Sequence, residues 1–150
     1  MIAFRPATAS EDERQVARMD RLCFPIDAPP TFAGAHWHIG WDGEEPACYC
    51  AWKPVDHDGE VGFLYRGGVL PAYRGHGLQR EMIRLRETEM LQRSIAASIT
   101  YTDADGAASM RSLIAEGYRP YVPTPATTLS GLGRLGRVGF VHWRKDLAAR

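Results

Sequence analysis

Residues 60–92 constrain the fold of this chain more than any other stretch. Residues 60–69 are rich in aromatic and branched side chains, which favour a strand, and residues 80–92 are almost all good helix formers. The joint between them reads LPAYRGHGLQ. The N–H groups at a helix start lack intrahelical partners, and Gly75 and Gly77 leave room for an anion to reach them. The joint therefore predicts an anion cradle; a plain turn, with glycines that serve geometry alone, is the alternative.

The remaining patterns predict a mixed α/β domain. We expect strands at 2–6, 36–41, 47–52, 60–70, 95–102, 118–122 and 138–143, and helices after Ser10, from 78 to 92 and from 107 to 116. The first helix is expected to bury Val16, Met19, Leu22 and Cys23, and the last one Met110, Leu113 and Ile114. Gly67-Gly68 indicates a bulge or a close backbone approach within its strand.

Composition narrows the class of protein. The 150 residues favour one domain spanning 1–150, and 18 basic residues balance 18 acidic ones. This balance gives no general attraction to nucleic acid or to a membrane surface, and no apolar run is long enough to span a bilayer. Three cysteines, an odd number, argue against a disulfide framework, and no secretion signal is visible. We therefore expect a cytoplasmic protein with neither nucleic-acid nor membrane partners.

Two motifs resemble those of the GCN5-related N-acetyltransferase (GNAT) superfamily. Residues 69–78 are similar to its acetyl-CoA signature, Arg/Gln-x-x-Gly-x-Gly/Ala after a hydrophobic-x-Pro strand, with Arg74, Gly77 and Gln79 at the defined positions. Residues 105–118 resemble the second signature, with Gly106 where the family usually has asparagine. The resemblance implies the GNAT-like acyl-CoA N-acyltransferase fold, with a mostly antiparallel sheet, two splayed parallel strands (68–70 and 98–102) and helices on both faces.

The resemblance also implies a reaction, direct acetyl transfer from acetyl-CoA to a primary amine, and the residues that hold the donor. They are Val69, Leu70, Arg74, Gly75, His76, Gly77, Leu78, Gln79 and Ser109. A backbone N–H near Val69 or Leu70 would stabilise the developing oxyanion. The acceptor would be a small-molecule amine or a peptide N-terminus, and family habit also suggests a homodimer. A non-catalytic acyl-CoA-binding module and a partner-binding domain are the alternatives.

Acid–base chemistry is the open part of this interpretation. Leu113 occupies the position at which many relatives carry a tyrosine acid, so the candidates become Tyr101, Tyr65 and Tyr118, while Glu60 and His57 are weak candidates for the base. Core packing is the competing interpretation of each tyrosine. Phe24, Trp37 and Tyr118 are the expected acceptor-lining residues.

Two further patterns carry little weight. Residues 131–136 match G-x-G-x-x-G, but the dinucleotide fingerprint requires a strand before it and a helix after it, and here a strand follows. The pairs His36/His38 and Cys48/Cys50 could ligate a metal, yet their spacings are not those of structural zinc sites. We expect no metal.

Overall fold

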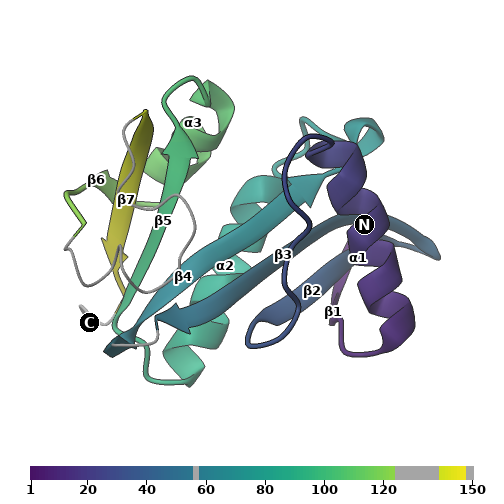
Figure 1. Cartoon of the computed structure of the whole chain (residues 1–150), viewed down its shortest axis with the longest axis horizontal. Helices are drawn as coiled ribbons and strands as arrows, with labels where there is room; N and C mark the ends of the chain where they lie inside the picture. The colour runs from purple at the N-terminus through teal and green to yellow at the C-terminus, as the bar shows by residue number, and fades with distance from the viewer. Residues whose placement is uncertain (56–57, 124–138, 148–150) are drawn as a thin grey trace. The chain divides into compact units, whose positions relative to one another are not determined.

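The computed structural model describes residues 1–55, 58–123 and 139–147. Within them the chain forms β1 (Ala3–Pro6), α1 (Ser10–Cys23), β2 (His36–Asp42), β3 (Glu45–Val55), β4 (Asp58–Val69), a short 3-10 helix η1 (Pro71–Tyr73), α2 (Leu78–Gln92), β5 (Ala97–Asp103), α3 (Ala107–Ala115), β6 (Arg119–Pro120) and β7 (Phe140–Asp146) (Figure 1). The expected order of strands and helices is confirmed, with shifts of a few residues at the ends.

The strands are hydrogen-bonded in the order β1-β2-β3-β4-β5-β7-β6. Neighbours pair antiparallel in β1–β2, β2–β3, β5–β7 and β6–β7, and β4 pairs parallel with β5. The parallel register runs from Val61↔Ala97 to Phe63↔Ile99. This mixed sheet with three α-helices confirms the expected α/β class. The chain nevertheless forms two compact units, residues 1–52 with 65–82 and residues 53–64 with the chain from 83 onward, and each is described by itself.

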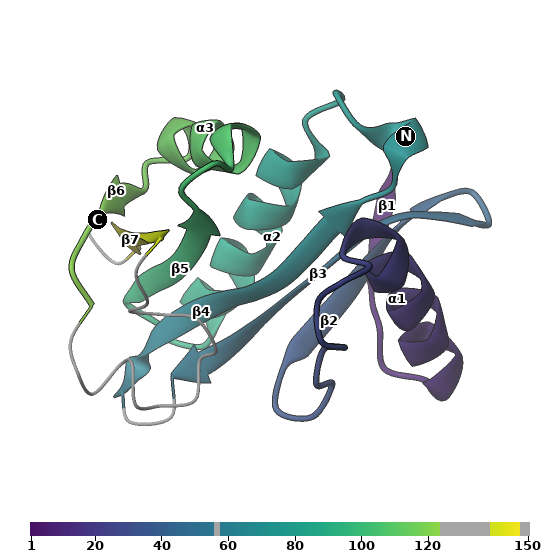
Figure 2. The ribbon, with the colours of Figure 1, turned by 45° about the horizontal axis from the view of Figure 1, so that its top comes forward.

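In the first unit, α1 covers one face of β2 and β3, as Figures 1 and 2 show. Val16 and Met19 pack there with Trp37, Ile39 and Tyr49. The expected stripe is wrong at Leu22, which is 62% exposed. Because the helix turns 100° per residue, the inward position next to Met19 belongs to Asp20, which is buried.

The start of α1 also differs slightly from expectation. Ser10 is the first helical residue, and Ala9 holds the capping position in extended backbone. The Asp12 carboxylate accepts the backbone N–H groups of Thr8 and Ala9, each at 3.1 Å. Asp12 thus satisfies donors ahead of the helix, as the reciprocal half of a capping box does.

Strand β4 changes face within the first unit. Tyr65 packs edge-on against Trp37, and the next residue, Arg66, binds Asp20 of α1. Successive residues of a regular strand point to opposite faces, so two neighbours on the α1 side indicate a bulge-like irregularity. The close backbone approach expected at the glycine pair is confirmed at Gly68, where a Cβ would lie 2.8 Å from the Tyr49 ring.

Ion pairs connect elements of the second unit. Arg84 of α2 makes a two-pronged ion pair with Glu116, with contacts of 2.8 and 2.9 Å, and Lys145 of β7 binds Glu87 at 2.9 Å.

Leu113 is buried as expected, but Ile114 is 59% exposed, which corrects the expected inward stripe of α3. Gly117 ends the turn after α3 with φ +93°, a conformation that favours glycine.

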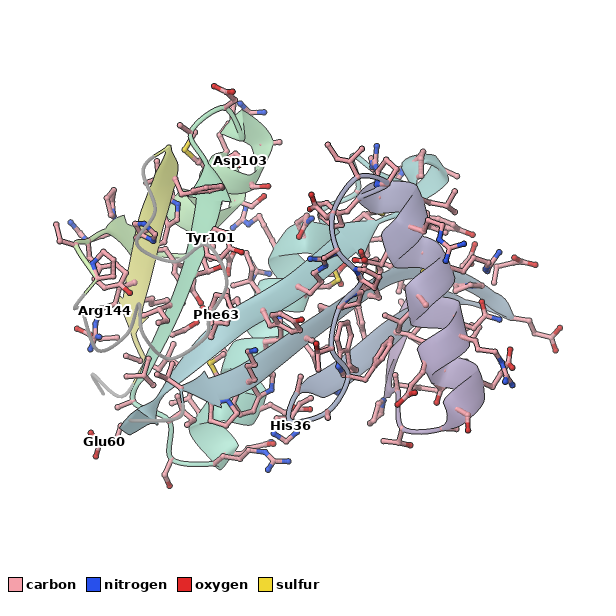
Figure 3. The ribbon with its side chains drawn as sticks, in the orientation of Figure 1. His36, Glu60, Phe63, Tyr101, Asp103 and Arg144 are labelled. Carbon is pink, nitrogen blue, oxygen red and sulfur yellow. The ribbon has the colours of Figure 1, made fainter. Side chains whose placement is uncertain are left out.

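An aromatic cluster lies on β4, β5 and β7 of this second unit. Tyr101 stacks on Phe63 with ring centroids 6.0 Å apart, and it packs edge-on against Phe140 at 5.5 Å (Figure 3). His142 is the direct cross-strand neighbour of Tyr101, at 6.4 Å between rings. The neighbouring residue Gly62 packs against Met90 of α2, so the cluster occupies the opposite face of β4.

Candidate functional site

The loop between β4 and α2 owes its path to its proline and glycines. Leu70 caps η1, Pro71 takes its first position, and the Tyr73 N–H donates to the Leu70 carbonyl at 2.9 Å. Gly75 and Gly77 follow with φ +82° and +78°, in the left-handed region that side chains disfavour. The Glu81 N–H then donates to the Gly77 carbonyl at 3.1 Å, which opens α2. The two glycines are therefore required by the turn itself.

The same loop leaves its backbone accessible. A Cβ placed on Gly75 or Gly77 would meet nothing within 4 Å, and residues 74–77 are exposed. Leu78 is buried and fixes the helix start, whose first N–H groups have no intrahelical acceptor. Open space above two glycines at a helix start suits an anionic group such as a diphosphate. The residues present thus fit the donor that the sequence motif implied.

Arg74 has a contact that the motif did not predict. Its Nε–H donates to the Val69 carbonyl at 2.9 Å, and the Cys23 thiol donates to the same oxygen at 3.7 Å. Burial raises the pKa of Cys23, and the hydrogen bond with Arg74 partly opposes that rise. Arg74 is thus tied to the end of β4 as well as being exposed at the rim of the loop.

The backbone at Leu70 is already engaged. Its N–H donates to the Ala47 carbonyl of β3 at 3.0 Å. For the Leu70 N–H to stabilise an oxyanion, its hydrogen bond to the Ala47 carbonyl would first have to break. The oxyanion role at Val69 or Leu70 stays a prediction.

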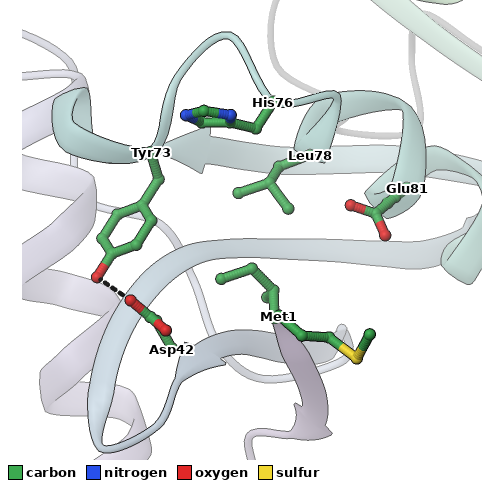
Figure 4. Close-up of a pocket in the computed structure, with 7 residues that line it drawn as sticks. Met1, Asp42, Tyr73, His76, Leu78 and Glu81 are labelled. Carbon is green, nitrogen blue, oxygen red and sulfur yellow. Dashed lines mark hydrogen bonds between the residues drawn. The ribbon is translucent and has the colours of Figure 1, made fainter.

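A pocket of about 390 Å³ adjoins the loop within the same unit (Figure 4). Tyr73, His76 and Leu78 line it together with Met1, Ile2, Asp42 and Glu81. The Tyr73 hydroxyl donates to the Asp42 carboxylate at 2.9 Å, which raises the pKa of Tyr73. Two carboxylates make this pocket unsuitable for a diphosphate, so the glycine backbone is the better candidate.

The other predicted site residues fall into both units. In the first, the Tyr65 hydroxyl accepts the Thr31 N–H at 2.9 Å, Trp37 is 5% exposed in the core, and Phe24 ends α1. In the second, Tyr101 lies in the aromatic cluster and Ser109 is exposed on α3.

Tyr118 is the most enclosed of the candidates. It is 2% exposed, and its hydroxyl donates to Ser98 at 2.7 Å. Burial raises its pKa, so its proton stays in place at neutral pH. A role for Tyr118 toward an acceptor would require this packing to open. The roles proposed for these residues stay predictions, and His57 and residues 131–136 lie outside the described residues.

Sequence reasoning missed a buried polar network in the first unit. Asp20 accepts the Tyr49 hydroxyl at 2.6 Å and two Arg66 N–H groups at 2.8 Å each. The available signals were an aspartate one residue after Met19 in the buried stripe, and an arginine directly after the run VGFLY at 61–65, which has no charged residue. Burial raises the pKa of Tyr49, and the bond to the Asp20 carboxylate raises it further.

Across residues 1–55, 58–123 and 139–147, no group of three or more His, Cys, Asp or Glu side chains is arranged to hold a metal ion. None of the helices in those ranges is long and apolar enough to cross a membrane.

Comparison with known proteins gives the family. The model of the acetyltransferase (GNAT) family matches residues 6–113. A mycothiol acetyltransferase from Catenulispora acidiphila is 33% identical over 82 residues, which are 52% of this chain and 26% of that protein. The chain thus spans about a quarter of the length of the curated relative it matches.

Solved structures show the same fold. The ribosomal-protein-S18-alanine N-acetyltransferase from Escherichia coli has a TM-score of 0.75 at 15% identity, over 100% of this chain and 96% of that one. A putative acetyltransferase from Salmonella typhimurium, solved with its cofactor acetyl-CoA, has a TM-score of 0.73 at 13% identity, over 99% and 95%. With the family match over 6–113, these findings establish that the chain belongs to the acetyltransferase (GNAT) family.

Proposed function

We propose that this chain is an acetyl-CoA-dependent N-acetyltransferase that acts on a primary amine. The observation that carries the proposal is the loop at 74–78, in which two positive-φ glycines leave the backbone open at the start of α2. Acetyl-CoA would bring the acetyl group as a thioester. The N–H groups from Gly75 to Gln79 would bind its diphosphate, and Arg74 would add a permanent positive charge at the rim.

The chain's own groups would then position the reactants and move protons. The end of β4, at Val69 and Leu70, would hold the acetyl end of the donor. There the N–H of Val69, or that of Leu70 once it is released from the Ala47 carbonyl, would stabilise the oxyanion. Holding donor and amine together in one complex supplies a large part of the acceleration. Tyr101 is our choice for the acid that protonates the departing thiolate, because it is partly exposed whereas Tyr118 is enclosed.

The acceptor class is a small-molecule amine or a peptide N-terminus. The two named relatives support both options, because one is named for the alanine of a ribosomal protein and the other for mycothiol. An acetylation assay with an amine panel tests the proposal. The panel contains the peptide Ala-Ala-Ala, glucosamine and putrescine, and the readout is release of the CoA thiol. Amine-dependent release is expected; no release with any of the three, despite acetyl-CoA binding, would contradict the proposal.

One observation favours a second candidate function, a non-catalytic acyl-CoA-binding module. Leu113, at the position where relatives place a tyrosine acid, is buried and has no proton to donate. A protein of this kind would be stabilised by acetyl-CoA yet release no CoA with any amine. The same panel, combined with a thermal-shift measurement, therefore separates the two functions.

A further inference from the structure

Residues 24–32, here called the strap, follow α1 on the way to β2 and form neither a helix nor a strand. Side chains of the sheet hold its backbone at three points. Arg66 donates to the Ala28 carbonyl at 3.0 Å, the Tyr65 hydroxyl accepts the Thr31 N–H at 2.9 Å, and the Trp37 indole donates to the Phe32 carbonyl at 3.3 Å. A segment without its own hydrogen-bond ladder is thus fixed from outside.

Arg66 is the residue that ties the strap to the protein core. Two of its N–H groups bind the Asp20 carboxylate, and its guanidinium lies 5.1 Å from the centre of the Phe24 ring. Asp20 is only 3% exposed and also accepts the Tyr49 hydroxyl. A lysine could not reproduce this set of contacts, because only the planar guanidinium offers several N–H groups in a fixed fork.

The stability of the fold is a weak explanation for such a pair. Apolar side chains of similar volume often stabilise a protein as well as a buried ion pair does. What the pair adds is a defined geometry, because each charge accepts only a few arrangements. A defined position for the strap is therefore the better explanation for the pair.

The strap begins beside the proposed donor site. The thiol of Cys23, the residue before the strap, donates a hydrogen bond to the Val69 carbonyl, which also accepts one from Arg74. Its sulfur and the Tyr49 ring fill the space over Gly68. Within the first unit, the end of α1 therefore lies against the end of β4, and the strap continues directly from it. An amine that approached the end of β4 from this side would meet them.

We propose that Arg66 is a positioning residue which, through Asp20 and Ala28, holds the strap as one wall of the acceptor site and so determines the affinity for the amine. This inference rests on the proposed acetyltransferase function. The buried Asp20 carboxylate and the Ala28 carbonyl both accept hydrogen bonds from the Arg66 guanidinium, and the Tyr49 hydroxyl donates to the same carboxylate.

The test compares Arg66→Gln, Arg66→Lys and Asp20→Asn with Arg84→Gln. The last is the matched control, because it also breaks a two-pronged Arg–carboxylate pair, but one whose two members belong to the second unit. Hydrogen exchange of the strap amides and the KM values for acetyl-CoA and for the best of the three panel amines are measured.

We expect Arg66→Gln and Asp20→Asn to speed exchange in the strap at least tenfold and to raise the KM for the amine about tenfold, with the KM for acetyl-CoA within twofold of wild type. Arg66→Lys should lie between, because it retains the charge without the fork. Arg84→Gln should change neither the exchange nor the amine KM.

Three results would overturn the inference. They are unchanged exchange in the strap, an equal rise of both KM values, or the same amine effect in the control. If Arg66→Gln does not fold, Arg66→Lys and Asp20→Asn carry the same readouts. A wild type that releases no CoA with any amine refutes the proposed function itself. A wild type that turns over while its variants keep the same amine KM refutes only the role of Arg66.

Discussion

The replacement Gly68→Ala tests the close packing of β4 against α1 and β3. The added methyl carbon would lie 2.8 Å from the Tyr49 ring, 2.9 Å from its hydroxyl and 2.9 Å from the Cys23 sulfur. Real Cβ atoms do not approach this closely, so a neighbour must move. The Tyr49 ring is fully buried and its hydroxyl is held by Asp20 at 2.6 Å, so it cannot move freely.

The expected cost follows from this rigidity. Overpacking a well-packed core costs about 1–3 kcal/mol, and we place Gly68→Ala at the upper end, about 3 kcal/mol. For a chain of this size that lowers Tm by about 6–12 °C. Urea unfolding, followed by tryptophan fluorescence and circular dichroism, measures the free energy of unfolding.

Two other glycines of β4 are matched controls. At Gly62 the three atoms nearest to the added carbon, at 2.8–3.2 Å, all belong to Met90, and this flexible side chain can move aside, so about 1 kcal/mol is expected. At Gly59 nothing lies within 4 Å and the backbone is not in the left-handed region, so Gly59→Ala should be nearly neutral. Equal stability of the three variants would refute the described packing at Gly68.

Four more predictions follow from individual contacts. Gly77→Asp should abolish the thermal shift caused by acetyl-CoA. Gly43→Asp should keep this shift, because Gly43 also has a positive φ and open space around it but lies outside the loop. Loss of the shift in both variants would indicate backbone strain as the cause. Tyr101→Phe should lower kcat about 100-fold, as expected for loss of a general acid, while Tyr118→Phe, which removes a bond to Ser98, should cost only about 1 kcal/mol of stability. An unchanged kcat for Tyr101→Phe across the pH range removes it as the acid. Lys145→Met leaves the Glu87 carboxylate buried without its cation and should lower the free energy of unfolding by about 3 kcal/mol. Adding Glu87→Leu should restore most of the lost stability. A Lys145→Met variant as stable as wild type would contradict the burial of this pair. Burial raises the pKa of Cys48 from 9.0 to about 12, so the thiol loses its proton at a lower pH in the unfolded chain than in the folded one. The free energy of unfolding should therefore fall between pH 9 and 12, and it should fall less in Cys48→Ala. The same pH dependence in the variant and in wild type would contradict this prediction.

Local patterns were sufficient to predict most of the elements. The strand at 60–70, the turn glycines and the helix from Leu78 are each encoded within a few neighbouring residues. The errors concern which face is buried. Leu22 and Ile114 are apolar yet exposed, because burial depends on the elements packed against a helix and not on its own composition alone.

The polar network could not be predicted in the same way. Tyr49 lies 29 residues and Arg66 lies 46 residues after Asp20 in the chain, and only the fold brings the three together. Likewise, the change of face at Tyr65 and Arg66 depends on the contacts of both residues with α1 and β2. The sequence offered a bulge or a close backbone approach at Gly67-Gly68, and the close approach is what the structure has at Gly68.

The most direct test of the account is a titration of the isotope-labelled protein with acetyl-CoA, followed by the backbone amide signals in NMR spectra. If the loop binds the diphosphate, the N–H signals of Gly75, Gly77 and Gln79 should shift progressively and saturate, and those of the Gly43 turn should stay in place. Saturable shifts elsewhere with no change at Gly75 and Gly77, or no shift at all, would contradict the proposed donor site.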